Sequence, residues 1–263
     1  MKAWKRIHIT KKRAACGVLG LLLLAAAYMG VPRAAEKVFA VAEGERRLPI
    51  YCVQTEKPQV SVSFDAAWGA DDTDELLRIL KENDVKATFF LCGYWVEKYP
   101  EEVKKIAAEG HDLGNHSATH PHMSRISSEE IAQELQKCHE NVKKLTGVEM
   151  ELFRPPFGEY DNHVIETAEQ NGYYTIQWDV DSLDWKEQGA EVDIRQVLEH
   201  KHLGNGSIIL FHNDAKYTPK VLDTILKGIK EKGFEIVPIS QLIHRENFEM
   251  DHEGRQIPKG KDV

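Results

Sequence analysis

The chain has 263 residues, of which 42% are apolar and 29% are charged. It is therefore long enough for one sizeable domain plus an appendage, and its composition excludes general disorder. Residues 14–263 hold 28 cations against 42 acidic residues, a net charge of −14, which argues against nucleic acid as a partner. Cys52, Cys92 and Cys138 follow the N-terminal segment, and their odd number is not a disulfide framework.

The N-terminal segment, residues 1–33, has the pattern of a membrane-targeting sequence. Six cations and no acid stand in its first thirteen residues, and the nineteen residues 14–32 are uncharged. In a helix this stretch spans roughly 28 Å, close to the thickness of the bilayer hydrocarbon. The basic flank should stay in the cytoplasm, so we expect the rest of the chain outside the cell membrane. The segment is either a retained single-pass anchor, which its length favours, or a signal peptide cleaved after Ala27 or Ala42.

Residues 34–57 are predicted to be a tether that ends in the short strand "LPIYCV", and strands and helices alternate after it. The predicted strands cover 60–64, 86–92, 151–156, 173–180, 206–212 and 234–240. The predicted helices cover 72–83, a stretch opened by Pro100, and 128–146. Ser127 and Glu130 form a capping box before the last of these helices, and Gly147 ends it.

Alternation of strands and helices on this scale predicts an α/β fold with a parallel sheet. About seven units fit an irregular (β/α) barrel over residues 58–244. The charged residues 245–263 are predicted to be a loose tail. In such a barrel the functional residues collect just after the strands. The candidates at those positions are Asp65, His116, His120, Arg154, Asp181, Asp184 and His212.

Several of these candidates have side chains suited to a metal or an acyl group. On a helical turn, the spacing of His116 and His120 puts both imidazoles on one face, close enough to share a metal. The alternative is a pair of histidines that face solvent or cap a helix. Arg154 stands before "PPFG", a stiff turn, and either clamps a carboxylate or lies on the surface. His212 ends a strand, where an imidazole can act as general acid.

The segment "DSLDW" suggests contact with a sugar. Trp185 offers an indole face on which sugar rings stack, while an exposed tryptophan is otherwise costly. The alternative is a packed tryptophan, with Asp184 as a helix N-cap. The segment holds a second acid, Asp181, at the end of the preceding strand.

In order, "SFD", "HSATH", "RPPFG", "DSLDW" and "LFH" resemble the five motifs of the polysaccharide deacetylases, the NodB homology domain of carbohydrate esterase family 4. The resemblance covers residues 58–244, and "FDAAWG" and "RRLPIYCV" look most like the sporulation-associated subgroup. It implies a TIM-barrel-like fold and a hydrolase that removes N-acetyl groups from amino sugars of peptidoglycan or a chitin-like polymer. Removal of O-acetyl groups is an alternative. The implied cofactor is a divalent metal, zinc first.

By this resemblance Asp65 is the general base, and His116 and His120 are metal ligands. Arg154 would orient Asp65, and Asp181 would support Arg154. These roles are expectations carried over from the family motifs.

The same resemblance assigns the rest of the site. His212 would protonate the leaving amine, and Leu210 and Trp185 would line the acetyl pocket and groove. The backbone N–H of Phe157, together with the metal, would hold the developing oxyanion.

Ala66 departs from the family pattern, because it stands where the family has its metal-binding aspartate. Catalytic zinc usually keeps three protein ligands, so the metal site should be weakened. Asp71 or Asp72 can replace the missing ligand, although Asp72 with Glu75 also fits a helix start. Two functions follow. One is a metal-assisted cell-wall deacetylase, and the other is a glycan-binding or structural domain that has lost efficient turnover.

Overall fold

The computed structural model describes residues 46–259 of the chain. The predicted membrane segment at 14–32 lies outside these residues. Within the described part, no helix has both the length and the apolar character needed to cross a membrane.

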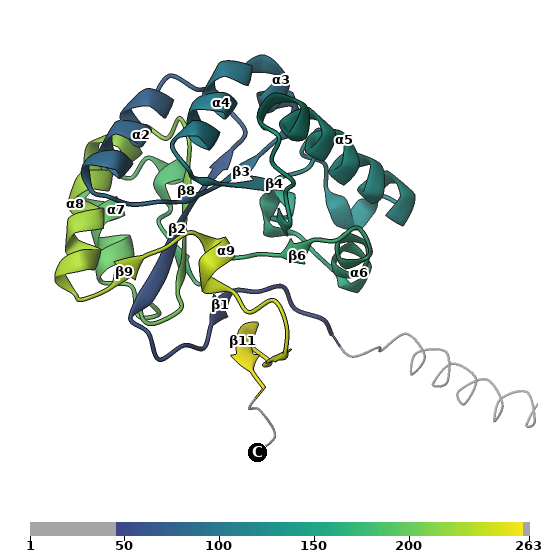
Figure 1. Ribbon diagram of the computed structural model, residues 1–263. Helices are drawn as coiled ribbons and strands as arrows, with labels where there is room; N and C mark the ends of the chain where they lie inside the picture. The colour runs from purple at the N-terminus through teal and green to yellow at the C-terminus, as the bar shows by residue number, and fades with distance from the viewer. Residues whose placement is uncertain (1–45, 260–263) are drawn as a thin grey trace, which may run out of the picture. The chain divides into compact units, whose positions relative to one another are not determined.

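A curled sheet of parallel strands forms the centre of the described region (Figure 1). The strands run in the order β6-β5-β4-β3-β2-β8-β7, and β9 pairs with β2. Their bounds are β2 (Gln59–Ala66), β3 (Thr88–Leu91), β4 (Asp112–Asn115), β5 (Leu152–Phe153), β6 (Tyr174–Thr175), β7 (Val180–Asp181), β8 (Ile208–His212) and β9 (Glu235–Ile236). This arrangement confirms the predicted α/β class and the parallel sheet of about seven strands.

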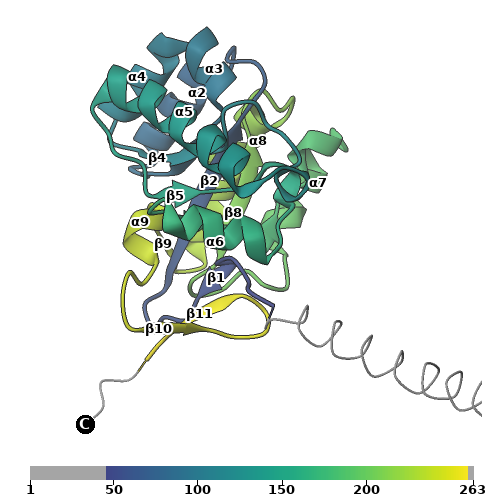
Figure 2. The ribbon, with the colours of Figure 1, turned by 90° about the vertical axis from the view of Figure 1, so that its right-hand side faces the viewer.

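Helices cover the outer face of this sheet (Figures 1 and 2). They are α2 (Thr73–Glu82), α3 (Gly93–Lys98), α4 (Pro100–Ala108), α5 (Ser128–Thr146), α6 (Asn162–Gln170), α7 (Ala190–Leu198), α8 (Thr218–Glu231) and the short α9 (Ile239–Leu242). Helices α2 and α8 each bury an apolar stripe in the main core. Leu80 belongs to the stripe of α2, and Leu222 to that of α8. The apolar periodicity of the sequence therefore sets which face of each helix meets the sheet.

Strand β2 alternates between two environments. Phe64 lies in the main core and stacks on Phe89 and Phe211, at centroid distances of 4.9 and 5.7 Å. Ser63 Oγ, one residue earlier, donates a hydrogen bond of 2.8 Å to the carbonyl of Ile209. Successive side chains of a strand point to opposite faces. The alternation thus carries Asp65, the residue after Phe64, to the face shared with Ser63.

The ends of two helices test the capping predictions. The capping box of α5 is confirmed, because Ser127 and Glu130 exchange side-chain and backbone hydrogen bonds and Gly147 ends the helix at φ 76°. The predicted start of α2 at Asp72 is confirmed, but the expected capping hydrogen bond is absent. Asp72 occupies the N-cap position without a capping hydrogen bond, because its carboxylate accepts a 2.8 Å hydrogen bond from the backbone N–H of Asp214 instead.

Two further element predictions are wrong. Residues 173–180, predicted as one strand, form β6 and β7, which lie at the two edges of the curled sheet. The chain leaves β6 because Gln177 N donates to Ile50 O at 2.7 Å and Asp179 N donates to Ile208 O at 3.2 Å. Both neighbours come from distant parts of the sequence, so the local pattern does not predict the break.

The second correction concerns the predicted loose tail. Its residues form β10 (Phe248–Met250) and β11 (Arg255–Pro258), which make a three-stranded sheet with β1 (Cys52–Val53), visible below the barrel in Figure 2. Gln256 anchors it, because its buried amide exchanges hydrogen bonds of 2.7 and 2.6 Å with the backbone of His244. The predicted domain boundaries otherwise stay predictions.

Candidate functional site

A cavity of about 440 Å³ lies at the carboxyl ends of β2, β7 and β8. It brings together eight of the residues selected from the sequence: Asp65, His116, His120, Phe157, Asp181, Trp185, Leu210 and His212. Four further residues line it: Gly158, from the stiff turn "PPFG", and Ala67, Trp68 and Trp178, which the sequence did not single out.

Arg154 is buried directly behind Asp65. Its Nη1 donates a 2.7 Å hydrogen bond to Asp65 Oδ1. Its Nη2 donates to Ser63 Oγ at 2.9 Å and to the carbonyl of Gln177 at 3.1 Å. The guanidinium also packs 4.1 Å from the ring centroid of Phe90. The surface alternative for Arg154 is therefore wrong, and its carboxylate partner is Asp65.

The charges around Asp65 keep it ionised. Burial alone would raise the pKa of this carboxyl, but the positive charge of Arg154 and the nearby imidazoles of His116 and His212 lower it below its usual value. His116 Nε2 lies 3.7 Å from Asp65 Oδ2. The cavity therefore holds a carboxylate at neutral pH, although a low pKa makes it a weak base.

Asp181 lines the cavity, and the side-chain hydrogen bonds of Arg154 go to Asp65, Ser63 and Gln177 rather than to Asp181. Its Oδ1 accepts a 2.9 Å hydrogen bond from the backbone N–H of Leu183. Burial lowers the pKa of Arg154, and the charges of Asp65 and Asp181 act against that change. Asp181 therefore acts on Arg154 through its charge.

His212 and Asp184 form a second buried pair. Asp184 Oδ1 lies 2.8 Å from His212 Nδ1, and its Oδ2 accepts 2.8 and 2.7 Å hydrogen bonds from the backbone N–H of His212 and from Thr218 Oγ1. Burial alone would lower the pKa of His212, but the hydrogen bond and charge of Asp184, with the charges of Asp65 and Asp181, raise it. A protonated imidazole beside the cavity can donate a proton.

Asp184 was among the candidates after the strands, but its pairing with His212 was not predicted. It starts the short 3-10 helix 184–186 and is completely buried, which a solvent-exposed N-cap would not be. The available signal was its position in the same segment as Asp181. Only the fold shows that this acid meets the end of β8.

His116 and His120 lie in a loop after β4, so the predicted helical turn is wrong. Ser117 and His120 have positive φ values of 67° and 59°, and this bend brings the two imidazoles to a centroid distance of 4.9 Å. His116 Nδ1 lies 2.7 Å from the carbonyl of Arg154, which leaves Nε2 toward Asp65. Burial lowers the pKa of both imidazoles, that of His120 to about 4.

The third ligand position holds no donor. Ala66 is 1% exposed and belongs to the apolar core between sheet and helices. Among the residues that line the cavity, neither Asp71 nor Asp72 is found. Across residues 46–259, no group of three or more His, Cys, Asp or Glu is placed to hold a metal ion. The residues present do not fit the three-ligand zinc site that the resemblance implies.

Aromatic side chains form the rim of the cavity. Phe157 is 57% exposed, has a left-handed φ of 60°, and stacks on His122 at 4.5 Å. Trp185 is 51% exposed, and the buried Leu210 also lines the cavity. Exposed rings at the rim of a cavity offer apolar faces on which a ligand ring can stack.

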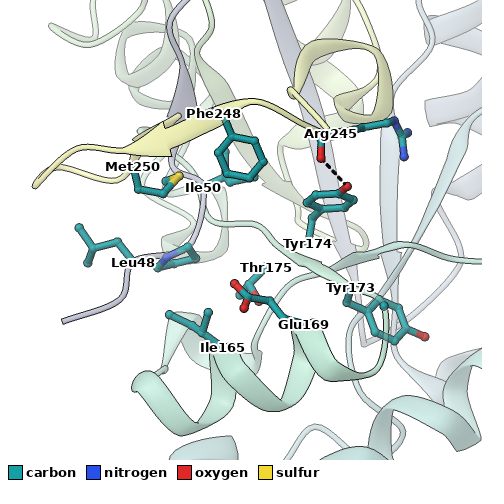
Figure 3. Close-up of a pocket in the computed structure, with 12 residues that line it drawn as sticks. Leu48, Ile50, Ile165, Glu169, Tyr173, Tyr174, Thr175, Arg245, Phe248 and Met250 are labelled. Carbon is teal, nitrogen blue, oxygen red and sulfur yellow. Dashed lines mark hydrogen bonds between the residues drawn. The ribbon is translucent and has the colours of Figure 1, made fainter. Parts of the chain in front are cut away.

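A second cavity of about 320 Å³ lies beside α6, β6 and β10 (Figure 3). Its walls are mainly apolar, with Ile50 and Phe248 among them, and Tyr174 donates a 3.0 Å hydrogen bond to the carbonyl of Arg245 there. The charged side chains at its edge already have partners, since Glu169 pairs with Arg47 at 2.7 Å. The chemistry described above belongs to the first cavity.

Comparison with known proteins identifies the family. A sequence model described as "Polysaccharide deacetylase" matches residues 53–176. The peptidoglycan-N-acetylglucosamine deacetylase of Bacillus cereus is 34% identical over 190 residues, which cover 71% of this chain and 68% of that protein. This chain belongs to the polysaccharide deacetylase family. The uncharacterized protein YlxY of Bacillus subtilis is 36% identical, and the match covers 74% of this chain and 60% of YlxY, so the chain spans about three fifths of that relative.

Solved structures of the family include a relative that is described as a pseudoenzyme. This CE4 family protein from Bacillus anthracis has 33% sequence identity and a TM-score of 0.71, and the match covers 81% of this chain and 73% of that one. A mutant of the same protein is described as having restored enzymatic activity. It has 38% identity and a TM-score of 0.71, with 74% and 70% covered. The family therefore contains both peptidoglycan deacetylases and a pseudoenzyme similar to this chain.

Proposed function

We propose that this chain binds N-acetylated amino sugars of cell-wall glycan, most simply peptidoglycan, in the cavity between Asp65 and His212. The observation that carries the proposal is the junction of two buried pairs, Asp65–Arg154 and His212–Asp184, in one cavity with an aromatic rim. The B. cereus relative, named as a peptidoglycan-N-acetylglucosamine deacetylase, supports this choice of ligand.

The cavity offers complementary groups to an acetamido group. Asp65 is an ionised acceptor for an amide N–H, and a protonated His212 is a donor for the carbonyl or the amine. Arg154 keeps Asp65 from being an unpaired buried charge, and Asp184 fixes the orientation of His212. Trp185 supplies a face for the sugar ring. Each of these groups is held before the ligand arrives, which lowers the entropic cost of binding.

A second candidate function is slow deacetylation by the same site. It is favoured by the raised pKa of His212, which suits a general acid for the leaving amine. The lowered pKa of Asp65 makes it a weak base toward an ordinary water molecule. We therefore expect slow hydrolysis of N-acetyl groups. An O-acetyl ester, whose alkoxide leaves without prior protonation of nitrogen, is the easier substrate.

The test compares the full-length chain with its Ala66→Asp variant. Acetate release from N-acetylated peptidoglycan is measured with and without added Zn²⁺, and binding of the same glycan is measured by sedimentation. We expect the natural chain to bind glycan and release little acetate, and the variant to release about 10²-fold more when zinc is present. Fast acetate release by the natural chain would replace the binding proposal by the deacetylase. Failure of the natural chain to bind would refute glycan recognition.

We also propose that the domain works outside the cytoplasmic membrane, where its glycan is, and in sporulation. The basic leader and the uncharged stretch 14–32 support this location. Protease added to intact protoplasts should digest the domain, and protection would contradict the orientation. Release of a shorter soluble chain would replace the anchor by a cleaved signal.

A further inference from the structure

Trp68 is an exposed tryptophan in the loop that follows Asp65. It has no role in the binding of the acetamido group proposed above. It lines the cavity, and 54% of it is exposed. Its ring stacks on the imidazole of His212, with a centroid distance of 5.5 Å and an angle of 30° between the planes. One side of the indole is thus covered by a functional residue, while much of the ring stays in contact with solvent. Such a surface is costly unless a ligand covers it.

The backbone on both sides of Trp68 is fixed by hydrogen bonds from neighbouring elements. Ala67 N donates to Asn213 Oδ1 at 3.1 Å, and Gly69 N donates to Asp214 Oδ2 at 3.1 Å. The carbonyl of Gly69 accepts a 2.8 Å hydrogen bond from the Trp95 indole. A Cβ on Gly69 would lie 2.2 Å from Asp214 Oδ2, so a larger residue here would displace the Asp214 carboxylate and its hydrogen bond to the loop. The indole is therefore held in place before any ligand binds.

Exposed aromatic surface is concentrated at this cavity. Among residues 46–259 the large exposed hydrophobic side chains are Trp68, Tyr94, Phe157 and Trp185. Three of them line the cavity, and the fourth, Tyr94, donates its hydroxyl hydrogen bond to the carbonyl of Ala67, next to Trp68. Pyranose rings have an apolar C–H face that packs on aromatic rings, whereas their hydroxyl groups stay hydrated.

We propose that Trp68 is a stacking platform for a pyranose ring of the glycan, adjacent to the ring whose acetyl group lies between Asp65 and His212. The inference rests on the proposed glycan binding and adds to it a preference for oligomers. The sugar ring that stacks on Trp68 makes a second contact with the protein. A monosaccharide bound at His212 has no such second ring. Affinity should therefore rise with the number of sugar rings, and Trp68 should supply that increase.

The test is calorimetric titration of the full-length chain with N-acetylglucosamine and with its β-1,4-linked tetramer. The natural chain should bind the tetramer more tightly than the monomer. Trp68→Ala should weaken tetramer binding by about tenfold and monomer binding much less, while Trp68→Phe should keep most of the tetramer affinity. Phe248→Ala, which removes an aromatic ring from the second cavity (Figure 3), is the matched control and should change neither affinity.

The outcomes separate this inference from the proposed function. Unchanged tetramer affinity in Trp68→Ala, with binding intact in the natural chain, refutes the platform and leaves glycan binding standing. Equal losses in Trp68→Ala and Trp68→Phe, or an equal loss for the monomer, would also refute it, because stacking of a neighbouring ring would not be the cause. Absence of binding of either sugar by the natural chain is the failure of the proposed function itself. An unchanged thermal midpoint verifies that the variants fold.

Discussion

The cavity has two halves, and only one of them has all the side chains that its proposed role requires. In the acid–base half, Asp65 and His212 each have a buried partner, Arg154 and Asp184, at 2.7 and 2.8 Å. In the histidine half, His116 and His120 face the same cavity, but the adjoining strand position is Ala66, whose methyl group packs in the apolar core. One half keeps the groups that would recognise and protonate a substrate in the proposed function. The other lacks a donor that a catalytic metal requires.

The residues of the two halves contribute to the stability of the fold to different degrees. Arg154 is completely buried and bonds Asp65 and Ser63 of β2 and Gln177, so its loss would disturb β2 and the segment between β6 and β7. An alanine at position 66 fits the core without strain, because small apolar residues are at home there. A metal ligand can therefore be lost at little cost to stability, whereas removal of the buried Arg154 should destabilise the fold.

The largest expected effect breaks the acid–base half in the Ala66→Asp background. Asp65→Asn and His212→Ala should each lower acetate release from peptidoglycan by about 10²–10⁴-fold, the usual cost of removing a general base or acid. The initial rate with zinc present is the measurement, and an unchanged thermal midpoint is the control for a folded variant. Turnover equal to that of the parent variant would remove these residues from the chemistry.

The buried pair can also be broken from the side of Arg154. Arg154→Met should lower the free energy of unfolding by about 3–5 kcal/mol, because it leaves Asp65 buried without its cation. Arg245→Met is the matched control. It removes an exposed arginine that pairs with Glu151 at the surface, and such pairs contribute less than about 1 kcal/mol. Urea denaturation measures the free energy of unfolding of both variants. Equal losses of free energy would mean that the Asp65–Arg154 pair contributes no more than a surface ion pair.

The histidine half is tested by the response of stability to zinc. A carboxylate at position 66 is costly in the apolar core, so it should turn toward the histidines once zinc is present. Zinc at about 100 times its dissociation constant should then stabilise Ala66→Asp by about 2.7 kcal/mol. The natural chain should respond much less at the same zinc concentration, and His120→Ala should remove the response of the variant. An equal response in the natural chain would reveal a metal site that the cavity residues do not explain.

The smallest expected effect concerns an acid behind the acid–base half. Asp193 is buried with neither carboxylate oxygen hydrogen-bonded, and burial, with the charge of Asp184, raises its pKa to about 6. A folded-state pKa above the unfolded one gives stability that is present at low pH and lost as the pH rises through about 6. Asp193→Asn should therefore stabilise the chain by about 1–2 kcal/mol at pH 7.5 and change little at pH 4.

Thermal unfolding at the two pH values measures this gain. Glu191→Gln, at an exposed position on the same helix, is the control and should have no effect at either pH. A gain of the same size at pH 4 would show that the carboxylate charge is not its cause.

The capping signals illustrate how far local sequence reaches. Ser127, Glu130 and Gly147 determine both ends of α5 by contacts within a few residues, and the prediction there is confirmed. Asp72 has the same kind of signal, but its carboxylate bonds Asp214, far along the chain. A local rule fails where a distant backbone donor competes for the same side chain.

Sequence alone determined the strand–helix alternation, the parallel sheet and the family motifs, because hydrophobic periodicity and turn residues are local properties. It also located the unusual Ala66 and most of the side chains that meet in the cavity. The tertiary structure decided the rest. It divided 173–180 between two sheet edges, paired Asp184 with His212, buried Arg154 behind Asp65, and placed Trp68 against His212. Each of these depends on strands and loops that are distant in sequence, and contacts of that kind exist only once the sheet has curled and brought their ends together.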